Sequence, residues 1–227
     1  MKKTHIILLI LASSFISKGQ SYEKGNLLIS AGVRIGYYST KSYLEGVHQK
    51  DDNNTAGNLN YPITAQYGIS NKFSIGLRFQ PASWGDDPED DFKTSNTSNM
   101  FALVGEYHLL KSNKSDLYAE LSVGTITWNQ KHNDGTLPFP QVKGNIVNKY
   151  KGINYRAGLG YRIYLGNTIG LFWNVTYSYY GMKLKESIGT THMFPDDPID
   201  YMNNGETDFK IKTSGIEFTF IGLVVKI

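Results

Sequence analysis

The sequence contains no cysteine, and after its first residues it has no long apolar run. The absence of cysteine excludes thiol catalysis, thiolate metal sites, disulfide bonds and a lipid anchor on an N-terminal cysteine. Beyond the N-terminus no stretch approaches 18 consecutive apolar residues, so the sequence predicts no transmembrane helix.

The N-terminus is typical of a secretory signal peptide. Two lysines at positions 2 and 3 precede an apolar run over residues 6–16, and the small residues Ser17 and Gly19 follow. The run is about half of the ~20 residues that a membrane-spanning helix needs, which favours a cleaved signal over a membrane anchor. We expect residues 1–19 to be a cleaved signal peptide and residues 20–227 to form a single domain.

The formal net charge of +3 at pH 7 comes from this signal. Without Lys2, Lys3 and Lys18, the 23 basic residues fall to 20, which equals the number of acidic residues. A formally neutral mature chain gives no reason to expect a nucleic-acid partner.

Apolar residues recur at every second position after residue 20, which is typical of strands with one apolar face. The clearest two segments cover residues 153–165 and 169–180. They are joined by Gly166-Asn167, a pair that favours a tight hairpin. Pro62 argues against a regular central strand at its position unless a bulge or a strand end accommodates it. The other six segments are 27–37, 59–69, 73–80, 101–109, 117–125 and 216–227.

The connections between these segments alternate in length. After the second, fourth and sixth segments they are short, at 70–71, 111–115 and 166–167. After the first, third, fifth and seventh they are long and polar, at 39–58, 81–98, 129–151 and 182–212. Short turns at one end and long loops at the other are typical of outer-membrane barrels. The sequence therefore predicts an all-β fold, an eight-stranded antiparallel up-and-down transmembrane β-barrel.

Lysine content decides which face of the barrel meets lipid, because the alternation alone also fits a soluble ligand-binding barrel. A soluble barrel would cover its outer face with Lys and Glu, whereas the predicted strands contain one lysine, Lys226. We therefore expect the apolar face to point outward into lipid. An aromatic belt at the membrane interface is expected from residues near the long-loop ends of the strands, namely Tyr37, Tyr61, Tyr177, Tyr179 and Trp128.

The residues between the apolar positions are mostly Gly, Ser, Thr and Asn, with a few charges. Charges inside a narrow lumen must pair, because burying an unpaired charge is costly. Eight strands leave an interior just wide enough for side chains, so we expect a charge network that fills the lumen, with a polar conduit as the alternative. Within it, we expect Glu120 to pair with Arg162 and Arg34 to pair with Glu217. The inward set is Arg34, Arg78, Glu106, Glu120, Arg156, Arg162 and Glu217.

The last predicted strand changes phase along its length. Ile216 and Phe218 alternate with Glu217, whereas the apolar positions of 221–227 follow the opposite phase. A β-bulge near residues 220–221 would keep both halves apolar on the outside. Without it, Glu217 would point at lipid.

The C-terminal residues 221–227 resemble the terminal strand signal of outer-membrane barrels, with alternating apolar residues up to the last position. Together with the repeat Ala-Gly-Leu-Gly-Tyr-Arg at 157–162, the chain is similar to the small OmpA, OmpX and OmpW-type barrel families. The resemblance implies a location in the cell outer membrane and insertion by the outer-membrane assembly machinery. The chain departs from the usual pattern by ending in Ile227 instead of an aromatic residue, which many barrels of the Bacteroidetes type tolerate.

Motifs for catalysis are lacking. The sequence has no His-x-Ser pairing and no Gly-x-Ser-x-Gly elbow, so we do not expect an enzyme, and no cofactor or metal is expected. We expect His108 and Glu106 to form a hydrogen-bonded pair in the lumen. A cluster of carboxylates in the second long loop could bind calcium or bridge to lipopolysaccharide through divalent ions, with a solvated acidic loop as the alternative. It consists of Asp86, Asp87, Glu89, Asp90 and Asp91.

The function that these patterns favour is that of a monomeric integral outer-membrane protein. Its role would be structural or surface-binding, through four long extracellular loops, in contact with outer-membrane lipid and lipopolysaccharide. One alternative is a narrow channel for small solutes, including hydrophobic ones that leave through the barrel wall, as the OmpW-type resemblance implies. A lipid-modifying enzyme is a third, which would need a catalytic triad at the rim that the sequence does not show.

Overall fold

The computed structural model describes residues 22–44, 47–48, 54–85, 93–112, 114–133, 143–194, 197–203 and 209–227. Within these ranges, no helix is long and apolar enough to cross a membrane. The expected signal peptide at 1–19 lies outside the described residues, and so does the expected cation-binding loop, with Asp86, Asp87, Glu89, Asp90 and Asp91.

The described chain consists of antiparallel strands joined in one sheet. The alternation of apolar and polar residues explains why they form, since each strand presents one face to each side of the sheet. The strands are β1 (Leu27–Leu44), β2 (Val47–His48), β3 (Asn54–Asn60), β4 (Ile63–Ser70), β5 (Phe73–Gly85), β6 (Lys93–Lys111), β7 (Ser115–Asn133), β8 (Lys143–Tyr164), β9 (Ile169–Phe194), β10 (Asp197–Asn203) and β11 (Phe209–Lys226).

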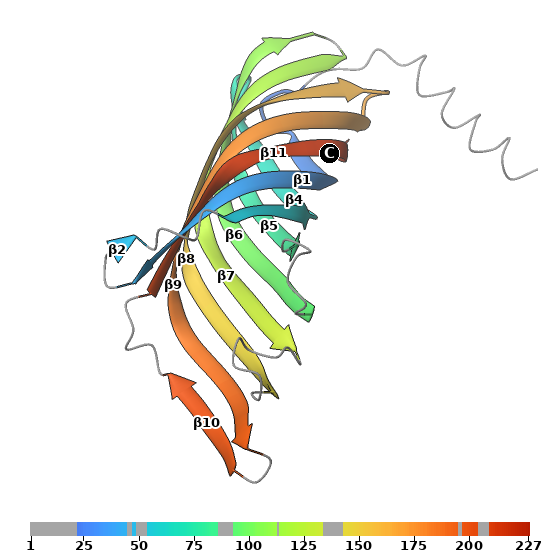
Figure 1. The fold of residues 1–227 in the computed structure, drawn as a ribbon. Coiled ribbons are helices and arrows are strands. Elements are labelled where there is room, and N and C mark those ends of the chain that lie inside the picture. Colours follow the sequence, from blue (N-terminus) through green and yellow to red (C-terminus); the bar gives the residue numbers. More distant parts are fainter. Residues whose placement is uncertain are drawn as a thin grey trace, which may run out of the picture.

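The sheet closes on itself. Its order is β9-β11-β1-β3-β5-β6-β7-β8, and β8 pairs with β9 to complete the ring. β3 and β4 are two halves of one position, because both lie between β1 and β5 and are separated by Tyr61 and Pro62. The predicted eight-stranded up-and-down barrel is therefore confirmed. β2 pairs with the end of β1 and β10 with the end of β9, and both lie at the end of the barrel away from the C-terminus (Figure 1).

The strands are longer than the sequence pattern predicts. β1 continues to Leu44, β9 continues to Phe194, and β10 lies wholly inside the expected loop 182–212. The predicted extents of the long loops are therefore wrong. Beyond the membrane both faces of a strand can be polar, so the apolar alternation stops while the hydrogen-bonded ladder continues.

Apolar side chains cover the outside of the barrel, and charged side chains lie inside it. Leu77, Leu121 and Ile35 are 69%, 67% and 54% exposed, whereas Arg34 is 1% exposed. A water-soluble protein rarely exposes a contiguous apolar surface of this kind, so the outer face of the barrel is built for hydrocarbon.

The last strand contains the irregularity that its phase change requires. The pairing of β1 with β11 passes from Val33 opposite Ile221 to Arg34 opposite Thr219, which leaves Phe220 as the extra residue of a bulge. Phe220 and Ile221 are both exposed in consequence. The bulge keeps apolar residues outward on both sides of it.

The interior contains charged and polar side chains and two apolar clusters. The smaller cluster lies towards the short turns, beside Arg162 and His108, and is formed by Tyr22, Leu28, Tyr164, Phe172 and Val224. The larger cluster lies towards the long strand ends and was not predicted. It contains Tyr38, Ala82, Trp84, Met100, Ala102, Ile126, Trp128, Tyr150, Tyr180, Met182 and Ile211.

The expected interfacial belt is wrong at one residue. Tyr37, Tyr61 and Tyr177 are 67%, 44% and 55% exposed on the outer face. Trp128 instead lies inside the barrel, with its ring centroid 5.7 Å from that of Trp84. The alternation of segment 117–125 places odd positions outward, so Trp128 shares the inward phase of Ile126, and its aromatic character misled the belt assignment.

Candidate functional site: the charged lumen

Glu217 bonds to four side chains of the lumen. Its carboxylate accepts hydrogen bonds from the Arg34 guanidinium at 2.9 Å and from the Arg156 guanidinium. It also accepts bonds from the hydroxyls of Tyr38 at 2.7 Å and Tyr180 at 2.6 Å. The donors come from β1, β8 and β9, and Glu217 is on β11. The pair expected between Arg34 and Glu217 is thus present, and the carboxylate joins four strands.

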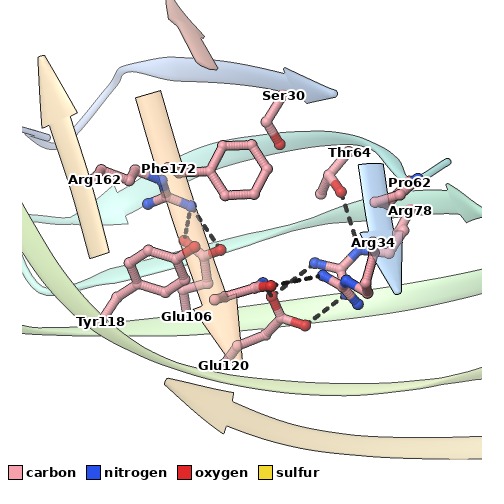
Figure 2. Close-up of a pocket in the computed structure, with 11 residues that line it drawn as sticks. Ser30, Arg34, Pro62, Thr64, Arg78, Glu106, Tyr118, Glu120, Arg162 and Phe172 are labelled. Carbon is pink, nitrogen blue, oxygen red and sulfur yellow. Dashed lines mark hydrogen bonds and ion pairs between the residues drawn. The ribbon is translucent and has the colours of Figure 1, made fainter. Parts of the chain in front are cut away.

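A second pair links Arg78 on β5 with Glu120 on β7. The two guanidinium nitrogens Nη1 and Nη2 donate to the two carboxylate oxygens at 2.5 and 2.7 Å, and Nε donates to Thr64 at 3.0 Å (Figure 2). The expected pairing of Glu120 with Arg162 is therefore wrong. In a narrow barrel a side chain can reach partners on strands across the lumen. Its ion-pair partner therefore need not lie on an adjacent strand.

Arg162 lies nearer the short turns and bonds to a different carboxylate. Its Nη2 is 2.7 Å from both carboxylate oxygens of Glu106, and its Nη1 is 3.3 Å from Asp116 (Figure 2 shows the contact with Glu106). The guanidinium carbon lies 3.9 Å from the centre of the Tyr118 ring. Charge and ring stacking together fix the position of this side chain.

Asp116 is a lumen residue that the sequence did not indicate. It is fully buried and accepts a hydrogen bond from His108 Nδ1 at 2.8 Å. The expected partner of His108 was Glu106, and this expectation is wrong. Asp116 precedes the predicted strand that starts at 117, so its inward orientation could not be inferred. With Asp116 included, four arginines of the described lumen face four carboxylates.

Tyr22 closes the end of the lumen near the short turns. Its ring stacks on His108 with centroids 3.7 Å apart and planes 8° apart, and its hydroxyl donates to the Phe73 carbonyl at 2.7 Å. Burial raises the pKa of the Tyr22 phenol to about 12, so the hydroxyl keeps its proton. Gly25 has a φ of 89°, a conformation that glycine adopts readily, and its N–H bonds to the Gly68 carbonyl at 2.9 Å.

A small void lies among the charged side chains. Its volume is about 10 Å³, and its lining includes Arg34, Arg78, Glu120 and Arg162. This volume holds the centre of roughly one water molecule. The residues around it are shown in Figure 2. The arrangement can hold strands together by charge pairing across the lumen.

The described residues show no metal site. Among the side chains in the ranges given above, no group of three or more His, Cys, Asp or Glu is arranged to hold a metal ion. The carboxylates of the lumen are bonded to arginine, histidine and tyrosine.

The fold is similar to that of solved outer-membrane barrels. No protein-family model and no curated protein matches the sequence. The outer membrane protein OprG from Pseudomonas aeruginosa matches with a TM-score of 0.52 and 14% identity, over 93% of this chain and 99% of OprG. The outer membrane protease OmpT from Escherichia coli matches with a TM-score of 0.50 and 12% identity, over 89% of this chain and 96% of OmpT.

Two observations now agree on the class of protein. The ring of strands has an apolar outer surface and a charged, filled interior, and the solved structures that share the ring are outer-membrane proteins. At these identities the likeness concerns the fold alone. The chain is an outer-membrane β-barrel, with the fold of the small outer-membrane barrel proteins.

Proposed function

We propose that this protein is a closed, non-conducting outer-membrane barrel whose role is structural and contact-forming at the cell surface. The filled lumen carries the proposal. The void among its charged side chains is about 10 Å³, and the arginines around it are bonded to carboxylates. Conduction would need a continuous path for water, and these side chains would have to move apart to make one.

The larger apolar cluster supports the same proposal. Trp84, Trp128 and Tyr180 lie in the lumen between the charges and the long strand ends. Hydrophobic constrictions in pores exclude water and ions. An ion entering from the long-loop end would therefore meet this cluster before it reached the charges.

The length of the strands supports a role outside the membrane. β8 has 22 residues and β9 has 26. A transmembrane strand needs about 9–11 residues, so roughly half of each strand extends beyond the bilayer. These extensions, with β10 at one edge, form a surface that is available for contacts with envelope components or other cells.

We further propose that the protein is not an enzyme. The protease OmpT shares the fold, but activity does not follow from a shared fold. The nearest arrangement to a catalytic dyad is His108 with Asp116. Tyr22 covers His108, and Asp116 is also bonded to Arg162, which supports a structural role for the pair.

Planar-bilayer recordings test the closed lumen. The wild-type barrel is expected to give no reproducible single-channel conductance, although heat-modifiable migration on a denaturing gel shows that it is folded. A variant with Arg78→Ala, Arg156→Ala and Phe172→Ala removes bulk from the charged lumen and is the matched comparison. Steady conductance of the wild-type protein, at a level equal to that of this variant, would overturn the closed-barrel proposal.

A shortened barrel tests the surface role. Residues 187–203, which contain the end of β9 and all of β10, are replaced by a two-residue turn, and attachment of expressing cells to other cells and to surfaces is measured. Attachment is expected to fall while the gel shift of the folded barrel remains. Attachment equal to that of wild type would contradict a contact role for this extension.

A further inference from the structure

Exposed lysines gather at the short-turn end of the barrel. One belongs to the N-terminal segment before β1, one to the turn between β4 and β5, and two to the end of β6 and the turn that follows it. The turn between β8 and β9, at residues 165–168, contains no charged residue. We call this group the turn lysines, and it consists of Lys24, Lys72, Lys111 and Lys114.

Hydrogen bonds hold three of these chain segments together. The N–H of Lys24 donates to Asn71 Oδ1 at 2.9 Å, which sets Lys24 beside the turn that carries Lys72. Lys111 Nζ donates to the carbonyl of Tyr22 at 3.1 Å, in the same N-terminal segment. The turn lysines are therefore neighbours at one part of the short-turn end.

Carboxylates are few at this end of the barrel. It consists of residues 22–26, 70–72, 109–116, 165–168 and 226–227. Only Asn113 in these segments is not described, and it is uncharged. The acidic residues here are Glu23, which acts on the charge of Lys226, and Asp116, which is buried and bonded in the lumen. Within these described segments no turn lysine forms an ion pair, so the group carries a positive charge at neutral pH.

The turn lysines border the lipid-facing wall. Phe73 follows Lys72 directly and is 40% exposed, and Leu110 precedes Lys111 and is 69% exposed. Short turns of outer-membrane barrels lie on the periplasmic side. The lysines therefore lie at the level of the inner-leaflet headgroups, and their flexible stems let the ammonium groups reach that interface.

An apolar hollow of about 640 Å³ lies in the same wall. Small residues form part of its lining on three neighbouring strands, with Gly105 on β6, Ala119 on β7 and Ala157 on β8. Larger apolar side chains, among them Tyr107 and Leu121, line the rest. The outer face of the barrel therefore has a depression where lipid meets it.

The hollow begins next to the turn lysines. Phe73, the neighbour of Lys72, is part of its lining. On β6 the lining extends from Tyr107 to Leu103, and four residues of strand span about 13 Å. One leaflet contributes about 15 Å to a hydrocarbon core of about 30 Å, so the hollow has the length of one leaflet's acyl region.

We infer that this wall binds an anionic phospholipid of the inner leaflet, with its phosphate on the turn lysines and an acyl chain in the hollow. Charge complementarity selects the headgroup, because lysines at a membrane surface attract anionic lipids. The hollow starts beside Lys72, so one molecule can occupy both sites. A soluble polyanion would use the lysines alone. The inference rests on the membrane location of the barrel and is independent of its proposed surface role.

Native mass spectrometry of the folded barrel in detergent measures the binding of phosphatidylglycerol and of phosphatidylcholine with the same acyl chains. The wild-type barrel is expected to prefer phosphatidylglycerol, whose headgroup is anionic. The variant Lys24→Gln/Lys72→Gln/Lys114→Gln is expected to bind it roughly 100-fold more weakly and to lose the preference. Lys111 is kept, because its bond to Tyr22 also holds the N-terminal segment in place.

The matched control is Lys41→Gln/Lys131→Gln/Lys151→Gln, with the same charge change at exposed strand positions towards the long-loop end. Its binding of phosphatidylglycerol is expected to equal that of wild type. Wild-type binding by the turn-lysine variant overturns the inference. An equal loss in the control also overturns it, because it would show attraction to any lysine of the barrel.

A second pair of variants tests the hollow. Ala119→Phe fills it from the outer face, whereas Ala65→Phe adds the same bulk to exposed β4 outside its lining. Ala119→Phe is expected to weaken phosphatidylglycerol binding roughly tenfold, which corresponds to the loss of about two buried CH₂ contacts. Equal binding by the two variants overturns the assignment of the acyl chain to the hollow.

Competition separates a lipid from a soluble anion. Inorganic phosphate and soluble polyphosphate are expected to displace phosphatidylglycerol only in part, and full displacement by either overturns the assignment to lipid. Raised salt is expected to weaken binding, and binding that does not change with salt contradicts a role for the lysines. The single variant Lys72→Gln, expected to bind roughly fivefold more weakly, provides the same test if the triple variant does not fold.

Discussion

Replacing Glu217 by glutamine perturbs the lumen where most of its bonds meet. The carboxylate accepts from Arg34, Arg156, Tyr38 and Tyr180, and its side chain is fully buried. Glutamine keeps the size of the side chain and removes its charge. The two guanidinium groups would then remain buried beside a neutral amide.

The magnitude follows from the burial of both partners. Removal of one member of a buried ion pair costs about 3–5 kcal/mol, because the remaining charge is left uncompensated. Arg34 keeps bonds to Thr219 and Asn174, and Arg156 keeps a bond to Gln80 at 2.5 Å, which places the expected loss within this range. We expect Glu217→Gln to lower the free energy of unfolding by about 3–5 kcal/mol.

Urea unfolding in lipid vesicles, followed by tryptophan fluorescence, measures this loss. Trp84 is a suitable reporter, because its ring lies 4.9 Å from that of Tyr38 and 5.9 Å from that of Tyr180. The control is Glu186→Gln. It breaks the pair with Lys149, in which both side chains are about 40% exposed, and its expected cost is about 0–1 kcal/mol.

The two variants together test whether the buried charge network stabilises the barrel more than a surface ion pair does. If Glu217→Gln and Glu186→Gln destabilise the barrel equally, the buried network contributes no more than a surface ion pair. That result would refute the reasoning that charge pairing fills and stabilises the interior.

Three further predictions concern packing and the outer surface, each measured by urea unfolding of the folded barrel. Gly76→Ala is expected to cost about 1–3 kcal/mol, because its Cβ would overlap the backbone of β4, whereas Gly105→Ala, whose Cβ meets a side chain at 3.4 Å, should be close to neutral. Tyr22→Phe is expected to cost about 1 kcal/mol through the loss of one hydrogen bond, and no loss would show that this bond is not formed. Leu77→Lys is expected to cost about 2–4 kcal/mol in vesicles and Thr127→Lys, opposite Lys151, about 0–1, and equal costs would show that Leu77 does not face hydrocarbon.

The barrel could be predicted because a membrane imposes a simple pattern on each strand. Within the bilayer the outer residues must be apolar, so segments such as 153–165 show their phase directly. The bulge at Phe220 followed from the same rule, since Glu217 could not face lipid. Outside the bilayer the rule no longer applies, and the ends of β1 and β9 were therefore predicted as loops.

Several lysines lie in strands at positions where the sequence pattern predicts loops. Lys151, Lys183 and Lys212 were expected in loops, and each lies within a regular strand. The scarcity of lysine in the predicted strands indicated the lipid-facing segment correctly. It did not indicate where the strands end.

The pairing inside the lumen was harder to predict than the set of residues that faces it. Alternation assigns a residue to the inner face, but the partner of Glu120 depends on which side chains meet across the barrel. Asp116 and Tyr22 were missed for a related reason. Each lies outside the predicted strands, where alternation gives no information about direction.

The seam between β1 and β11 has a consequence for the assembly of the barrel. It pairs Leu28 with Lys226, so the first and last parts of the domain must meet before the cylinder is complete. Contacts between such distant parts of a chain form slowly. Until the final strand arrives with Glu217, Arg34 and Arg156 lack their shared counter-ion. An incomplete sheet would leave these two charges unneutralised, and the strand that closes the ring also supplies their counter-ion.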